Sequence, residues 1–224
     1  MCFSTEASFS AGIILAVSGA VALKKVNHSS QIMFASMPLL FSIQQFTEGF
    51  VWITLTHPEY AHLQNIPIHI FMFFAQTLWP LWVPISLYFI EKNQARKKIF
   101  LLLIGAGLLL SGYHFYRAIY YEIHVSITPN HIAYRLDFNL IQKTILAISY
   151  FSLTIIAPFI SSIKRMPYLG ILIFCSFLIS KIFFTDSFIS VWCFFAAIIS
   201  VVVVLIINKM NTKFLGVGRE LRQR

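Results

Sequence analysis

The chain has 224 residues, of which 58% are hydrophobic and 11% are charged, and its mean hydropathy is +0.77. Soluble domains carry about 25% charged residues, so this composition excludes an ordinary soluble domain and indicates a chain that lies mostly in lipid. The net charge of +9 does not indicate a nucleic-acid-binding protein, because the basic residues lie in short loops between apolar runs.

Successive apolar runs predict seven transmembrane helices, because a segment in lipid must satisfy its own backbone hydrogen bonds. The runs cover residues 7–23, 32–55, 66–90, 99–121, 140–163, 168–184 and 188–207. We therefore expect an all-α fold, an integral membrane bundle of seven transmembrane helices over residues 1–207. Residues 208–224 are expected to form a basic cytoplasmic tail attracted to the membrane surface.

The distribution of Lys and Arg predicts how the bundle is oriented in the bilayer. Of the 17 basic residues, 13 fall in the connections of one side or in the C-terminal tail. The opposite connections, residues 57–65, 122–139 and 185–187, contain Arg135 and no other basic residue. Basic residues are enriched in cytoplasmic loops, so we expect the N-terminus outside and the C-terminus in the cytoplasm. The long loop 122–139 is expected to cover the outer face.

Prolines and glycines predict two local features of the helices. Pro80 and Pro84 each remove a backbone N–H, so the helix over residues 66–90 should bend or loosen near its middle. Gly105 and Gly107, in the next helix, are expected at a close contact between helices, because small residues let two backbones approach each other in a membrane.

Polar residues interrupt the second apolar run and carry the main functional signal. Gln44, Glu48 and Trp52 are spaced by four residues and share one helical face, which Gln45 widens. A charged side chain near the bilayer centre costs at least about 2.5 kcal/mol. Such residues therefore normally face the interior of the bundle and have a partner there.

Most ionisable groups at membrane level fall in the predicted outer half of the bundle, which indicates a polar pocket open to the outside and centred on Glu48. We expect Arg117, Lys181 or a bound cation to lie against Glu48. The expected function is the binding or transport of a small polar or amphipathic ligand, although each polar residue could instead serve only to tie helices together. The predicted ligand-binding residues are Gln44, Gln45, Glu48, Trp52, Gln76, His114, Arg117 and Trp192.

Two other functions remain open. The first is a membrane-embedded, metal-dependent enzyme, and its candidate metal ligands are Cys2, Glu48, His69, His114 and Cys193. Cys2 and Cys193 are both expected near the outer surface and could instead form a disulfide. The second is an accessory subunit of a membrane complex. The lipid bilayer is the expected partner in every case, and an oligomer is compatible with each function.

The opening Met1-Cys2-Phe3-Ser4, followed by Ala7-Ser8-Phe9, resembles the start of an uncharacterised family of small bacterial polytopic membrane proteins. Further segments are similar to that family: Gln44-Gln45-x-x-Glu48-Gly49-x-x-Trp52, Trp79-Pro80-x-Trp82-x-Pro84 and Ser190-Val191-Trp192-Cys193-Phe194. The resemblance implies a multi-pass protein of the bacterial inner membrane. It implies no particular activity.

Overall fold

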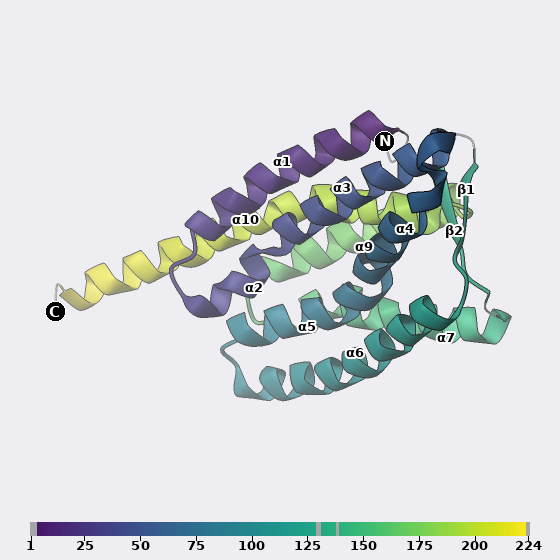
Figure 1. Cartoon of the computed structure of the whole chain (residues 1–224). Coiled ribbons are helices and arrows are strands. Elements are labelled where there is room, and N and C mark those ends of the chain that lie inside the picture. The colour runs from purple at the N-terminus through teal and green to yellow at the C-terminus, as the bar shows by residue number, and fades with distance from the viewer. Residues whose placement is uncertain (1–3, 129–130, 138, 223–224) are drawn as a thin grey trace.

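The protein is a bundle of long helices with a small β-hairpin at one end (Figure 1). The computed structural model describes residues 4–128, 131–137 and 139–222, with side chains up to residue 210. The first part of the chain forms α1 (Thr5–Lys24), η1 (Ser29–Gln31), α2 (Ile32–Ala35), α3 (Met37–Thr56), η2 (Pro58–Leu63), α4 (Asn65–Met72), η3 (Phe73–Leu78), α5 (Trp79–Ile90) and α6 (Gln94–Tyr120). The second part forms β1 (His124–Thr128), β2 (His131–Arg135), α7 (Leu140–Phe151), η4 (Ser152–Ile156), α8 (Ala157–Ile160), α9 (Met166–Phe183) and α10 (Phe188–Arg222).

Long apolar helices make this a membrane protein. Among the described residues, six helices are long and apolar enough to cross a bilayer: Thr5–Lys24, Asn65–Ile90, Gln94–Tyr120, Leu140–Ile160, Met166–Phe183 and Phe188–Met210. Their outer faces carry large exposed apolar side chains, such as Leu102 (75% exposed), Leu109 (79%) and Leu140 (80%). These faces suit contact with lipid, in which exposed apolar surface has no hydrophobic penalty.

Helix α3 differs from these six because it carries several polar side chains that are buried in the bundle. The run expected at residues 32–55 is divided at Ser36 into the short α2 and the 20-residue α3. Twelve residues of α3 are buried, and it packs against α1, α4 and α10. Its polar residues can therefore point into the bundle, which explains why its sequence is less apolar than that of the lipid-facing helices.

Small residues bring α1 and α3 together as an antiparallel pair (Figure 1). A side-chain Cβ built at Gly19 would lie 2.8 Å from the backbone nitrogen of Leu39. The Ser42 hydroxyl donates a 2.7 Å hydrogen bond to the Gly12 carbonyl on α1. Close backbone approach between small residues is a usual way for membrane helices to gain packing energy.

The loosening expected near Pro80 is present as the π-helical turn η3, directly before α5. A second π-helical turn, η4, ends two residues before Pro158 and was not predicted. Proline cannot donate the usual backbone hydrogen bond, so the preceding turn widens in both places. Gly107 also fulfils its prediction: a Cβ there would lie 2.6 Å from the Pro80 carbonyl oxygen. Gly105 does not, because nothing lies within 4 Å of its built Cβ.

The connection between α6 and α7 contains a β-hairpin, so the all-α prediction is incomplete. Strands β1 and β2 pair antiparallel from His124↔Arg135 to Thr128↔His131. Strand β2 contacts α10, and the ring of Tyr134 stacks on that of Phe71 at 4.7 Å. Strand β1 alternates polar and apolar residues, which is the period-2 pattern of a half-buried strand, whereas Ile132, Ala133 and Tyr134 of β2 are all buried. The hairpin packs into the bundle rather than only covering it.

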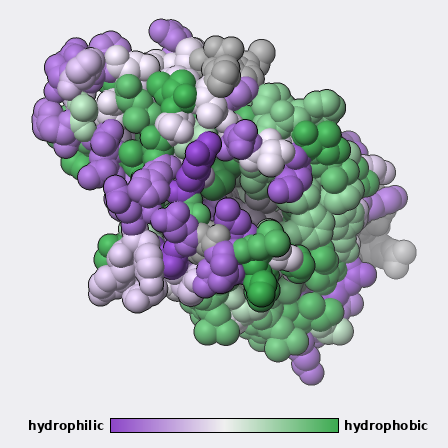
Figure 2. Space-filling view, turned by 90° about the vertical axis from the view of Figure 1, so that its right-hand side faces the viewer, coloured by the Kyte–Doolittle hydropathy of each residue, from purple (hydrophilic) through white to green (hydrophobic). Residues whose placement is uncertain are grey.

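The two ends of the bundle differ in charge and shape. The N-terminal end of α1 lies beside the hairpin, at what we call the hairpin end (Figure 1). Helix α10 does not stop at residue 207 but continues to Arg222 and leaves the bundle at the opposite, tail end. Hydrophilic residues gather over part of the hairpin end, beside a broad apolar surface (Figure 2).

Candidate functional site

A cavity of about 540 Å³ lies at the hairpin end, and we call it the hairpin-end cavity. It includes three of the predicted ligand-binding residues, Gln76, His114 and Trp192. Its charged lining residues come from the segment around β2 and from the helix ends nearby: Arg135, Asp137, Lys143, Lys181 and Asp186. Three basic groups against two acidic ones suit a ligand that carries an anionic or zwitterionic group.

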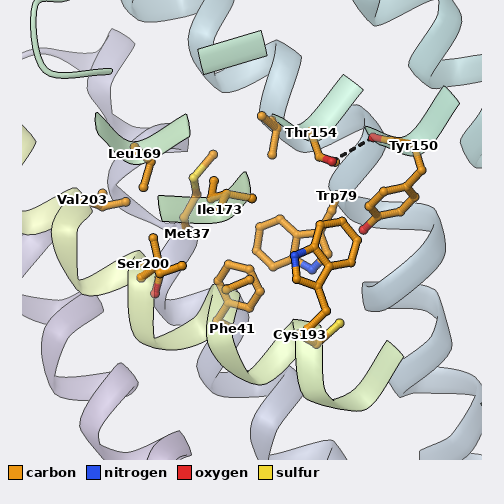
Figure 3. Close-up of a pocket in the computed structure, with 14 residues that line it drawn as sticks. Met37, Phe41, Trp79, Tyr150, Thr154, Leu169, Ile173, Cys193, Ser200 and Val203 are labelled. Atoms are coloured by element: carbon orange, nitrogen blue, oxygen red, sulfur yellow. Dashed lines mark hydrogen bonds between the residues drawn. The ribbon is translucent and has the colours of Figure 1, made fainter. Parts of the chain in front are cut away.

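A smaller apolar cavity of about 60 Å³ lies deeper in the bundle, and we call it the inner cavity. Phe41 and Trp79 form one side of it and Leu169 and Val203 another (Figure 3). A water needs about 10–15 Å³ of this kind of volume, so the inner cavity has room for on the order of four to six heavy atoms. Its lining suits a short apolar group.

Tyr150 and Trp192 line both cavities and therefore form the wall between them. Their ring centroids are 5.4 Å apart. The Tyr150 hydroxyl donates a 2.7 Å hydrogen bond to the carbonyl of Ala75 in the π-helical turn η3. In a π-helical turn, the carbonyl of residue 75 would accept a hydrogen bond from the N–H of residue 80, five positions later. Pro80 has no N–H and cannot donate that bond. The widened turn thus exposes an acceptor that holds Tyr150 in place.

Glu48 is fully buried and belongs to a polar cluster between α3 and α10. The Ser190 hydroxyl donates to one carboxylate oxygen, and the Gln45 amide donates to the other at 3.4 Å. Cys193 lies next to Glu48 on the α10 side. Because these groups come from two helices, Glu48 joins α3 to α10.

A second hydrogen bond ties this polar cluster to the inner cavity. The Trp79 indole N–H donates to the Gln44 side-chain oxygen at 2.9 Å, and the Trp79 ring stacks on Phe41 at 3.9 Å. Trp79 and Cys193 both line the inner cavity, whereas Glu48 and Gln44 do not. The polar cluster therefore lies outside the inner cavity and orients Trp79, which in turn stacks on Phe41 in the cavity lining.

Arg117 and Lys181 were the side chains expected against Glu48. Lys181 lines the hairpin-end cavity. Arg117 donates a 2.6 Å hydrogen bond to the Asp137 carbonyl, and its guanidinium lies 3.5 Å from the ring centroid of Tyr121. Arg117 thus ties α6 to the segment after β2. The expectation that Arg117, Lys181 or a bound cation lies against Glu48 stays a prediction.

The remaining predicted residues do not join one site. Trp52 packs in the apolar cluster under the hairpin. His69 is exposed on α4, and its ring nitrogen lies 2.7 Å from the Asn65 carbonyl. No group of three His, Cys, Asp or Glu side chains that could hold a metal ion occurs among the described residues, and Cys2 lies outside them. Cys175 and Cys193 are free thiols.

A family of unknown function (DUF6629) matches residues 1–215 of the chain. The chain belongs to this family. The match agrees with the predicted resemblance to an uncharacterised family and covers every helix described above up to the distal part of α10. No curated protein and no solved structure is significantly similar to the chain.

Sequence reasoning missed Tyr150, Lys143 and Ser190 as parts of these sites. Tyr150 had a usable signal, because a tyrosine within an apolar run needs a partner for its hydroxyl when it is buried. Lys143 had a weaker signal in the sequence, since it lies at the expected outer end of a helix. Ser190 had only its place in the segment Ser190-Val191-Trp192-Cys193-Phe194, because a lone serine in a membrane helix usually bonds to its own backbone.

Proposed function

We propose that the protein is a seven-span membrane protein that binds or transports a small amphipathic ligand entering from the hairpin end. The observation that carries this proposal is that a polar and an apolar cavity share one wall, the Tyr150–Trp192 pair. The polar group of the ligand would lie in the hairpin-end cavity. Its short apolar group would reach past the aromatic pair into the inner cavity.

The proposal includes α3 as the seventh span. At a rise of about 1.5 Å per residue, its 20 residues reach about 30 Å, which is the thickness of a bilayer core. Its polar face is turned to protein, so low hydropathy does not argue against crossing. We further propose that the hairpin end faces outward, that the tail end lies in the cytoplasm, and that the membrane is the bacterial inner membrane. The concentration of basic residues at the tail end supports that orientation.

Two features favour a site that changes shape. Both π-helical turns border the cavities: Gln76 in η3 lines the hairpin-end cavity, and Thr154 in η4 lines the inner cavity. Single π-helical turns are frequent at functional sites because their hydrogen bonds are easily rearranged. A small rearrangement of η3 would release the Ala75 acceptor from Tyr150 and open the wall between the cavities.

Straight-chain alkyl carboxylates of four to ten carbons test the proposal. The purified protein is placed in lipid nanodiscs, and binding is followed by tryptophan fluorescence with empty nanodiscs as the background. Each buried methylene contributes about 0.8 kcal/mol, so affinity should rise about fourfold per carbon. The rise should level off once the inner cavity is full, at on the order of six carbons.

The variants separate the two halves of the site. Lys143→Gln/Lys181→Gln should weaken binding of every chain length, because both groups line the hairpin-end cavity. Trp192→Ala should move the plateau to longer chains, because it removes part of the wall. Lys97→Gln/Lys98→Gln removes the same charge at the other end and should change nothing. An unlimited rise with chain length in all variants would mean simple partitioning into lipid and would refute the proposal.

A further inference from the structure

A third cavity lies at the tail end, on the opposite side of the bundle from the hairpin, and we call it the tail-end cavity. Its volume is about 940 Å³. The α5–α6 connection, the α8–α9 connection and α10 surround it. Apolar residues, among them Ile163 and Ile206, form one part of its lining. Basic residues form another: Lys92, Lys164, Arg165 and Lys209.

The backbone adds positive charge at the same place. Helix α9 begins at Met166, directly after Arg165 of the cavity lining, and no side-chain hydrogen bond caps its N-terminus. The N-terminus of a helix carries about half a positive charge because its first N–H groups are not bonded within the helix. Side chains and backbone therefore favour the same kind of ligand, an anion.

Glu91 fixes the geometry of the two connections. The residue is only 2% exposed, and its carboxylate accepts hydrogen bonds from the backbone N–H groups of Lys92 and Asn93, each at 2.9 Å. It also accepts from the Ser161 hydroxyl at 3.2 Å, from the Ser162 N–H at 2.7 Å and from the Ser162 hydroxyl. Burial raises the pKa of Glu91, but the bonds from Ser162, Asn93 and Lys92 outweigh it and hold the pKa below its ordinary value.

The Glu91 carboxylate thus remains ionised, yet it is not part of the cavity lining. It binds one connection to the other and holds their basic side chains side by side. Without such a tie, the like charges of the two connections would move apart. The cavity is therefore a built feature of the fold, not a chance meeting of loops.

We propose that the tail-end cavity binds the phosphate of an anionic phospholipid, with part of an acyl chain against its apolar side. Lys and Arg side chains at helix N-termini are the groups that bind phosphate in proteins. The apolar lining favours a lipid over a soluble anion. Tyr168 lines the same cavity and is 66% exposed, as expected of an aromatic residue at the level of lipid headgroups.

Titration of the full-length protein in detergent micelles tests this site. Phosphatidylglycerol is compared with phosphatidylcholine of the same acyl chains, and the bound lipid is counted by native mass spectrometry. The wild type should prefer phosphatidylglycerol. Lys164→Gln/Arg165→Gln should lower that affinity about 30-fold, which corresponds to about 2 kcal/mol, or about 1 kcal/mol for each basic residue near an anionic headgroup.

Matched variants exclude a general charge effect and a folding defect. Lys24→Gln/Lys98→Gln removes two basic residues of the tail end that do not line the cavity, and it should keep wild-type binding. Lys164→Arg/Arg165→Lys keeps both charges and should retain most of the affinity. Equal loss in the Lys24/Lys98 variant, or equal binding of the two lipids by the wild type, would overturn the proposal. Displacement of the lipid by millimolar inorganic phosphate would overturn its assignment to lipid and assign the cavity to a soluble phosphate compound.

Discussion

A single carboxylate, Glu48, shows how burial and partners decide the role of a residue. Four-residue spacing placed Gln44, Glu48 and Trp52 on one face, and the structure puts all three in the interior. They do not share one environment, however. Glu48 bonds to Ser190, which is 142 positions away in the chain, whereas Trp52 packs under the hairpin. The neighbouring Gln44 accepts a hydrogen bond from Trp79, which lines the inner cavity.

Substitution of Glu48 tests this structural role. Glu48→Gln keeps an oxygen acceptor between Ser190 and Gln45, so it should cost about 1 kcal/mol of unfolding free energy. Glu48→Leu removes the acceptor for both donors and should cost about 2–4 kcal/mol. Thermal unfolding of the purified protein in detergent measures both, with the exposed Glu6→Gln as a control.

The same experiment distinguishes a buried ion pair. If a basic side chain were the true partner, Glu48→Gln would cost about 3–5 kcal/mol, because it would leave that charge buried and unpaired. Neutralising Arg117 or Lys181 as well would then restore the melting temperature. We expect no such restoration, since Arg117 bonds to the Asp137 carbonyl and Lys181 lines the hairpin-end cavity.

At the scale of elements, prolines and glycines shape the contact between α5 and α6. Pro84 cannot donate to the Pro80 carbonyl four residues before it, so that oxygen projects from α5. Gly107 on α6 accommodates the oxygen because it has no side chain. The π-helical turn η3, directly before α5, is a second irregularity of the same helical segment, in addition to the projecting Pro80 carbonyl. The π-helical turn contains the Ala75 carbonyl that holds Tyr150, so local backbone chemistry helps to fix the wall between the two cavities.

Two glycines on α6 provide a matched test of this contact. A Cβ at Gly107 would lie 2.6 Å from the Pro80 oxygen, so Gly107→Ala should force the helices apart and cost about 1–3 kcal/mol. Gly105→Ala meets nothing within 4 Å and should be neutral or stabilising by up to about 1 kcal/mol, because alanine favours helix. Melting temperatures in one detergent compare the two. Equal effects would show that this close approach does not govern stability.

At the scale of the whole molecule, the distribution of charge and the path of the chain both distinguish two opposite ends of the bundle. The N-terminal end of α1 and the far end of α10 lie at opposite ends of the bundle, as an odd number of crossings requires (Figure 1). The hairpin and the hairpin-end cavity lie at one end, and the tail-end cavity with its basic residues lies at the other. The proposed ligand site and the proposed lipid site therefore serve different faces of the membrane.

Reporter fusions test the orientation and the seventh span together. A reporter that works only in the cytoplasm should be active after Arg224 and after Asn27. A reporter that works only outside should be active after His62, beyond the end of α3. If the reporters after Asn27 and His62 indicate the same side, α3 does not cross. If the reporter after Arg224 is active only outside, the assignment of the two faces is reversed.

The sequence by itself determined the membrane environment, the approximate limits of the long helices, the asymmetry of basic residues and the burial of the polar face of α3. These properties depend on local composition and on spacing along one helix, which a sequence displays directly. It also contained the alternation of β1, although the apolar runs on either side of that loop concealed it. The weakened turn at Pro80 followed from the missing N–H alone.

Only the tertiary structure decided which residues meet. Gln76, His114 and Lys143 line one cavity although they come from three different segments, and Glu48 accepts a hydrogen bond from Ser190, 142 positions away. Helices that are apolar on nearly every side do not reveal which face turns to lipid and which to a neighbour. The rotation of each helix and the choice of its neighbours are set by packing over the whole bundle, and the cavities follow from that packing.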